Sequence, residues 1–325
     1  MIKFSRLMQR SPHLGQYVKV LHVAAFQQRR IDLAIFPPVV YHLNHVEELS
    51  LTCTSFYPTP LTAFARLGPV RKLGLHGAGA LNNISKLAVF LNAYPTIQIL
   101  RPHDTTMRPQ IAHDPQLGIF AAALAQLPLK ALSYSGGAGD VLSCCFPLCP
   151  PKKLEELQVT MYDESEWTNV FRVLDTVVDS LRGLDIDMTH MLMYPGASWN
   201  EVPLAFAKVL KSSHVLDCLW LTGQPGDIQL INAILSRTPT SQLRELTVDL
   251  HGDGPPHLAH FRRLSALLND TARFPVFRSF NLELHGHWHS VDRTEFRRAV
   301  MEIFKSQAIG SMLQVELSDE REERD

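Results

Sequence analysis

One short pattern of apolar residues recurs along the chain. An apolar residue is followed by two variable positions, a second apolar residue, one variable position and a third apolar residue, as in Val46-Glu-Glu-Leu49-Ser-Leu51. Such alternation is typical of a β-strand with one buried face. About eleven copies occur, at a mean spacing of about 29 residues, which indicates a repeat protein. The copies begin at Val18, Val46, Val70, Ile97, Leu129, Leu154, Leu181, Leu216, Leu243, Phe277 and Met312.

Segments with helical spacing lie between these copies. The apolar residues from position 170 to 181 fall three or four positions apart, and so do those from 230 to 235 and from 296 to 304. Each repeat is therefore expected to consist of a strand, a turn, a helix and a second turn.

The alternation also distinguishes between the α/β folds that could contain these elements. The strands of a doubly wound sheet or an eight-fold barrel are buried on both faces and read as continuous apolar runs. Here polar residues such as Glu48 and Ser50, or Glu156 and Gln158, flank the central apolar residue. The sequence therefore predicts an α/β solenoid of the leucine-rich-repeat type, ribonuclease-inhibitor-like, with parallel strands on a concave face and helices on a convex face.

The expected domain organisation is simple. No linker rich in proline, glycine or serine interrupts the repeats, so residues 1–317 are expected to form a single irregular solenoid. Residues 1–16, with apolar side chains at Phe4 and Leu7, are expected to include an N-terminal capping helix. The acidic segment 318–325 is expected to be a disordered tail.

Composition narrows the classes of function. Lysine and arginine number 31 against 32 aspartates and glutamates, a balance that argues against general nucleic-acid binding. The longest apolar run, residues 119–125, is too short to cross a bilayer, so no membrane partner is expected. Five unpatterned cysteines fit reduced thiols better than a disulfide framework. We therefore expect a cytoplasmic or nuclear protein.

The opening segment carries a more specific pattern. It contains Ser11-Pro12-His13-Leu14-Gly15-Gln16-Tyr17-Val18, followed by Lys19-Val20-Leu21-His22-Val23. This run resembles the first repeat of the large F-box/leucine-rich-repeat families of mushroom-forming fungi. The resemblance implies a substrate receptor of a ubiquitin ligase, whose F-box would dock on the adaptor of a cullin-type ligase while the repeats hold a target. Residues 1–16 leave no room for an F-box, so the adaptor is an expected partner only if an F-box exists upstream.

Two short motifs suggest catalysis or metal binding as alternatives. Asp185-Ile-Asp187 matches the nucleophile motif of haloacid-dehalogenase-like phosphatases, yet both aspartates fall on the predicted wet face of a strand. His285, His287 and His289 alternate along the chain, a spacing that would place three imidazoles on one side of an extended segment and suits zinc or copper. The aspartates have no persuasive lysine or acidic partners downstream. His251, His257 and His260 in the preceding repeat could supply a fourth ligand to the histidines, but no cysteine has suitable spacing. No catalytic residue, metal or cofactor is therefore predicted, and metal binding by the histidines stays open.

The polar strand positions form the predicted binding surface. Trp220 is notable among them, because tryptophan is a frequent hot-spot residue of protein interfaces. The acidic residues suggest a partner that carries basic side chains. The predicted contact residues are Arg101, His103, Gln158, Asp185, Asp187, Trp220, Thr222, Glu245, Thr247 and Asp249.

The sequence thus favours a non-enzymatic protein-binding module, the substrate-recognition part of an F-box-like receptor. The alternative is a generic leucine-rich-repeat scaffold unconnected to ubiquitin. A metal-dependent hydrolase is a remote third reading, since it would require the histidines or aspartates to converge in a pocket.

Overall fold

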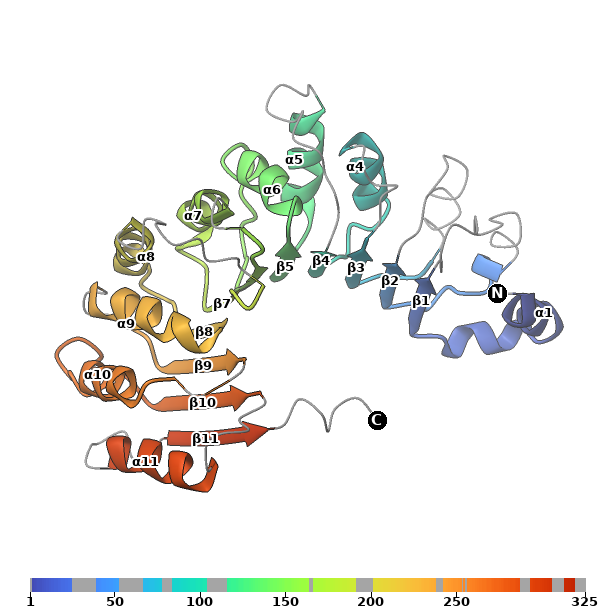
Figure 1. Ribbon diagram of the computed structural model, residues 1–325. Coiled ribbons are helices and arrows are strands. Elements are labelled where there is room, and N and C mark those ends of the chain that lie inside the picture. Colours follow the sequence, from blue (N-terminus) through green and yellow to red (C-terminus); the bar gives the residue numbers. More distant parts are fainter. Residues whose placement is uncertain are drawn as a thin grey trace. The chain divides into compact units, whose positions relative to one another are not determined.

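The computed structural model describes residues 2–24, 39–52, 67–77, 84–103, 116–163, 166–190, 201–237, 242–252, 254, 256–286, 293–305 and 313–318 (Figure 1). The chain divides into two compact units, Met1–Leu154 and Glu155–Asp325, here called the N-terminal and C-terminal units. The expected single domain over residues 1–317 stays a prediction. Of the expected acidic tail, residues 319–325 lie outside the described residues.

The N-terminal unit begins with a helix and continues with strands that pair in chain order. Its sheet is parallel, with β1 beside β2, β2 beside β3, β3 beside β4 and β4 beside β5. The strands are β1 (Val20–Ala24), β2 (Glu48–Thr52), β3 (Lys72–His76), β4 (Ile99–His103) and β5 (Ala131–Ser135). The helices are α1 (Ile2–Arg10), the 3-10 helix η1 (Pro12–Tyr17), α4 (Ile84–Asn92), α5 (Leu117–Gln126) and α6 (Ala138–Cys145).

The C-terminal unit repeats the same alternation. Its strands also pair in parallel and in chain order, from β6 to β11. The strands are β6 (Glu156–Thr160), β7 (Gly183–Asp187), β8 (Cys218–Gly223), β9 (Glu245–His251), β10 (Ser279–His285) and β11 (Leu313–Ser318). The helices are α7 (Glu166–Val177), α8 (Glu201–Ser212), the 3-10 helix η5 (Pro225–Asp227), α9 (Ile228–Arg237), α10 (Leu258–Leu268) and α11 (Arg293–Lys305). Helices α8 to α11 stack along one side of strands β8 to β11 (Figure 1).

A recurring backbone contact links successive strand starts. The carbonyl oxygen of Arg182 accepts hydrogen bonds from the amides of Asp217 and Cys218, at 2.9 and 3.0 Å. The carbonyl oxygen of Arg244 does the same for Arg278 and Ser279, at 2.8 and 3.0 Å. Because equivalent bonds recur at equivalent positions in both units, the chain is built from one repeated backbone unit.

Most strands alternate between buried and more accessible residues, as the predicted period of two requires. β5 is an exception, because its residues from Leu132 to Ser135 are all buried. In β10 the burial alternates along its full length, with Phe280, Leu282 and Leu284 buried. These inward side chains pack under the amphipathic helices, whose apolar residues recur three and four positions apart. The inward positions therefore build the core, and the outward positions form an open polar face on the sheet.

Each unit is thus an open, all-parallel sheet with alternating helices, a solenoid-like α/β arrangement. Its identity as a leucine-rich-repeat protein and the number of repeats stay predictions. Among the described residues, no helix has the length and apolar character of a membrane-spanning segment.

Candidate functional site

The outward face of the C-terminal sheet is strongly acidic. Strands β6 to β11 contain no lysine or arginine. Their carboxylates are Glu156, Asp185, Asp187, Glu245, Asp249, Glu283 and Glu316. The six carboxylates of β6 to β10 occupy the alternate positions that face away from the core, and we call the outward positions of β6 to β10 the acidic face. In an open parallel sheet these positions lie next to one another across strands, so their negative potentials add.

Strand register brings most of the predicted contact residues together. One row across the sheet consists of Gln158, Asp185, Trp220 and Thr247. The next row consists of Asp187, Thr222 and Asp249. Glu245 pairs with Cys218 in the row before them. The two remaining predicted residues, Arg101 and His103, lie on β4 in the N-terminal unit.

Trp220 is half-buried because it lies against a glycine. A Cβ atom at Gly183, on the neighbouring strand β7, would come within 3.1 Å of the indole Cζ3 atom. Because Gly183 has no side chain, the indole ring can pack closely against the sheet at this position. The ring is held in place while part of it stays accessible, as expected of a rigid aromatic contact residue.

Asp185 is the electrostatic centre of the acidic face. Its pKa is raised from the ordinary value of 3.8 to about 6, mainly by burial and in part by the neighbouring charges of Asp187 and Asp249. A hydrogen bond from Gln158 Nε2 to Asp185 Oδ2, 2.9 Å long, acts in the opposite direction. The site therefore contains a carboxylate whose charge opposes folding at neutral pH.

Replacing Asp185 by asparagine is expected to stabilise the protein at pH 7.5. Because the pKa is raised on folding, the folded carboxyl contributes full stability below pH 4 and loses it as the pH rises through about 6. The upper limit of this loss is about 3 kcal/mol, which solvent screening reduces to about 1–2 kcal/mol. Urea unfolding at pH 7.5 and pH 4 measures the difference, which should nearly vanish at pH 4. An equal difference in stability between the variant and the wild type at both pH values would contradict this interpretation.

The other acidic side chains are held by local contacts. Asp187 Oδ1 accepts hydrogen bonds from the backbone amide of Thr189, at 2.9 Å, and from the Thr189 hydroxyl. The Cys218 thiol donates to Glu245 Oε2 at 3.5 Å, and burial raises the pKa of Cys218 to about 11. These carboxylates are therefore fixed in position, and the Cys218 thiol stays protonated at neutral pH.

Thr247 departs from the expectation that it is open to solvent. It is only 9% exposed, and Asn281 Nδ2 donates to its hydroxyl at 3.4 Å. The expected exposure is wrong here because β9 has a neighbour on each side, β8 and β10, whose side chains cover a small residue between them. Thr247 therefore supports the face more than it contributes contact area.

The histidine neighbours differ from the sequence-based grouping. His285 is the last residue of β10, and His287 and His289 lie outside the described residues. Its described neighbours come instead from β9, where His251 and Asp249 approach it. A signal for this grouping was present in the sequence, since Val248-Asp-Leu250-His251-Gly252 and Leu282-Glu-Leu284-His285-Gly286 share one pattern.

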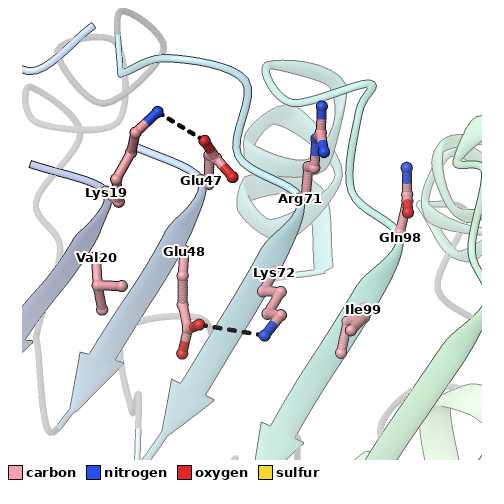
Figure 2. Close-up of a pocket in the computed structure, with 8 residues that line it drawn as sticks. All are labelled: Lys19, Val20, Glu47, Glu48, Arg71, Lys72, Gln98 and Ile99. Carbon is pink, nitrogen blue, oxygen red and sulfur yellow. Dashed lines mark hydrogen bonds and ion pairs between the residues drawn. The ribbon is translucent and has the colours of Figure 1, made fainter. Parts of the chain in front are cut away.

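The N-terminal unit has a hollow of a different kind. A volume of about 340 Å³ opens between the starts of β1 to β4 (Figure 2). Four of the charged groups that line it form two ion pairs, Lys19 with Glu47 at 2.8 Å and Lys72 with Glu48 at 3.5 Å, and Arg71 lies beside them. The contact with Lys19 lowers the pKa of Glu47. Exposed pairs of this kind contribute little to stability, and their paired charges cancel, so the hollow is a weaker candidate than the acidic face.

The sequence has no match among protein-family models and no match among curated proteins.

Proposed function

We propose that the chain is a non-enzymatic protein-binding module whose acidic face binds a basic segment of a partner protein. The observation that carries the proposal is the composition of β6 to β11, where carboxylates are aligned across strands and lysine and arginine are absent. A surface of one charge sign attracts a partner of the opposite sign and speeds its association.

Trp220 gives this surface a site for a single cationic side chain. Trp220 lies between Asp185 on β7 and Thr247 on β9 in the same row, and its indole ring packs against Gly183. An arginine or lysine that stacks on the ring gains a cation–π contact of about 1–2 kcal/mol. The carboxylates of Asp185 and Asp187 lie on the adjacent strand and can accept its N–H groups. The partner is therefore expected to present arginine or lysine in an extended segment.

Binding of a cation is expected to depend on pH in the opposite sense to stability. Asp185 attracts a cation only when it is ionised, and its pKa is raised to about 6. Affinity should therefore increase as the pH rises from 5 to 7.5, whereas the contribution of Asp185 to the stability of the free protein falls over the same range. Added salt should weaken binding, because part of the attraction acts between exposed charges.

The proposal is tested by quantitative affinity capture from an extract of the source cells. Wild-type chain is compared with Trp220→Ala and with Asp185→Asn. A partner of the acidic face should be depleted about thirtyfold by Trp220→Ala, which corresponds to a hot-spot loss of about 2 kcal/mol. Asp185→Asn should deplete it about fivefold or more, although this variant is expected to be the more stable protein. Loss of binding without loss of stability cannot result from misfolding.

Glu47→Gln is the matched control. It removes one exposed carboxylate from the N-terminal unit, in a contact with Lys19, and leaves the acidic face intact. Recovery of the partner should be unchanged. If wild type, Trp220→Ala and Asp185→Asn recover the same proteins in equal amounts, the acidic face is not the binding site and the proposal fails.

The finer proposal is that the module is the substrate-recognition part of an F-box-like ubiquitin-ligase receptor with leucine-rich repeats. It is supported by the resemblance of the run from Ser11 to Val23 and by the parallel strand and helix alternation. The same capture experiment tests it. Recovery of a cullin-ligase adaptor with the wild-type chain supports the receptor, whereas recovery of a partner of the acidic face without the adaptor favours a scaffold unconnected to ubiquitin.

A further inference from the structure

Three potential metal ligands meet at the carboxyl ends of β9 and β10. His251 Nε2 lies 2.9 Å from Asp249 Oδ2, and His285 Nε2 lies 3.2 Å from Asp249 Oδ1. One nitrogen or oxygen atom from each of the three side chains lies within 4.8 Å of the others. Glu283 Oε2 is 3.5 Å from the same nitrogen of His285.

Backbone geometry fixes this arrangement. His251 and His285 are register partners in the parallel sheet, and so are Asp249 and Glu283. Each histidine precedes a glycine with positive φ, 152° at Gly252 and 146° at Gly286, so both strands end at the same level. The Gly252 amide donates to the His285 carbonyl oxygen at 3.0 Å, which holds the two strand ends together.

The imidazoles are stacked so that their Nε2 atoms converge on one carboxylate. The ring centroids are 4.5 Å apart and the planes differ by 15°. Asp249 Oδ1 is shielded from solvent and accepts no hydrogen bond, although His285 Nε2 lies 3.2 Å away. A shielded carboxylate oxygen without a hydrogen bond is energetically unfavourable unless a cation satisfies it.

A second stacked pair in the N-terminal unit provides a comparison. His76 and His103 are register partners on β3 and β4, with ring centroids 5.2 Å apart and planes that differ by 6°. His76 also precedes a glycine with positive φ, Gly77 at 54°. In this pair His103 Nε2 lies 3.1 Å from the hydroxyl of Ser133, where His285 instead faces a carboxylate. Stacked histidines thus follow from the repeat, whereas the carboxylate distinguishes the pair in the C-terminal unit.

We propose that Asp249, His251 and His285 bind one divalent transition-metal ion of the zinc class. Imidazole nitrogens favour zinc, cobalt, nickel or copper over magnesium and calcium, which prefer ligand sets made of oxygen. Zinc bonds of about 2.0–2.2 Å in a tetrahedron separate neighbouring ligand atoms by about 3.3 Å, close to the separations observed here. Glu283 or water takes the fourth position. This proposal revises the sequence-based expectation of no metal and goes beyond the proposed protein binding.

The test is isothermal titration of the untagged full-length chain, freed of metal by a chelator, with ZnCl₂. One equivalent of zinc should bind, and zinc should raise the thermal midpoint, because it stabilises the folded state. CoCl₂ should give the visible absorption of tetrahedral cobalt bound to imidazole. His251→Gln and His285→Gln should each weaken zinc binding about tenfold or more, since each removes a ligand.

His76→Gln is the matched control, because it removes one imidazole from a stacked pair that faces a hydroxyl. Its zinc affinity should equal that of the wild type. Absence of zinc binding by the wild-type chain, or wild-type affinity in either of the other histidine variants, would overturn the proposal. Should those variants fail to fold, the cobalt spectrum of the wild type decides. Tetrahedral bands support the site, and the spectrum of the hydrated ion overturns it. Because these measurements use metal alone, their outcome does not depend on the protein partner.

Discussion

Replacing Phe206 by alanine should lower the free energy of unfolding of the C-terminal unit by about 3–5 kcal/mol. Phe206 on α8 is fully buried. Its ring meets Trp167 and Phe171 of α7 edge to face, with centroids 5.3 and 5.4 Å away. The substitution removes a large apolar side chain and two aromatic contacts between successive helices, and it leaves a cavity that helices fixed to a sheet cannot close.

Urea unfolding followed by tryptophan fluorescence measures this loss. All four tryptophans of the chain lie in the C-terminal unit, so the signal reports that unit alone. Leu204→Ala is the matched control, because Leu204 lies on the same helix and is 58% exposed. It should change stability by about 0.5 kcal/mol or less. A similar effect of both substitutions would contradict the packing of α7 against α8.

Replacing Gly15 by alanine should lower the free energy of unfolding by about 3 kcal/mol. A Cβ atom at this position would lie 1.9 Å from the carbonyl oxygen of His42 and 2.7 Å from its carbonyl carbon. Both are backbone atoms, so η1 would have to move away from the turn at His42. Hydrogen exchange measured by mass spectrometry should show faster exchange in residues 12–17.

Gly118→Ala is the matched control for this substitution. Gly118 lies in α5 of the same unit, and a Cβ atom there would meet no atom within 4 Å. Alanine should stabilise this helix by about 0.5–1 kcal/mol, because it restricts the unfolded chain and favours helix. If Gly15→Ala leaves exchange unchanged, the close approach of η1 to His42 is not present in solution. Gly15 also lies in the run from Ser11 to Val23 described above. The close approach to His42 explains why a glycine occupies this position.

The strands were predictable because their signal is local. Each apolar copy in the sequence falls on a strand, and alternation within a copy, such as Leu246 and Val248 in β9, sets which side chains face the core. The same frame assigned Gln158, Asp185 and Trp220 to a shared polar surface, where strand register now places them in one row.

Contacts between strands could not be deduced from spacing along one segment. His285 was grouped first with His287 and His289, and His251 was only one of three possible fourth ligands. The parallel register brings His251, 34 positions away, next to His285. The half-burial of Trp220 likewise depends on Gly183 in the adjacent strand. Burial of Thr247 depends on neighbours in two strands. Such features depend on the register between strands, which a single sequence does not specify.

The charge of Asp185 lowers stability, and we propose that it favours binding. Its burial beside Asp187 raises its pKa and opposes folding at neutral pH, so stability alone would favour asparagine. A charge held at the expense of stability is typical of functional sites. This contrast explains why the same substitution is expected to strengthen the fold and weaken binding.

Carboxylate labelling tests whether the acidic face holds the partner. Carbodiimide-driven coupling of an amine, read by mass spectrometry, is compared for the free chain and its complex with the captured partner. If the acidic face holds the partner, Asp187, Glu245 and Glu283 should lose reactivity in the complex. The helix carboxylates Asp175 and Glu302 should react equally in both states. Protection of the helix carboxylates, with undiminished labelling of the acidic face, would show that the partner binds elsewhere.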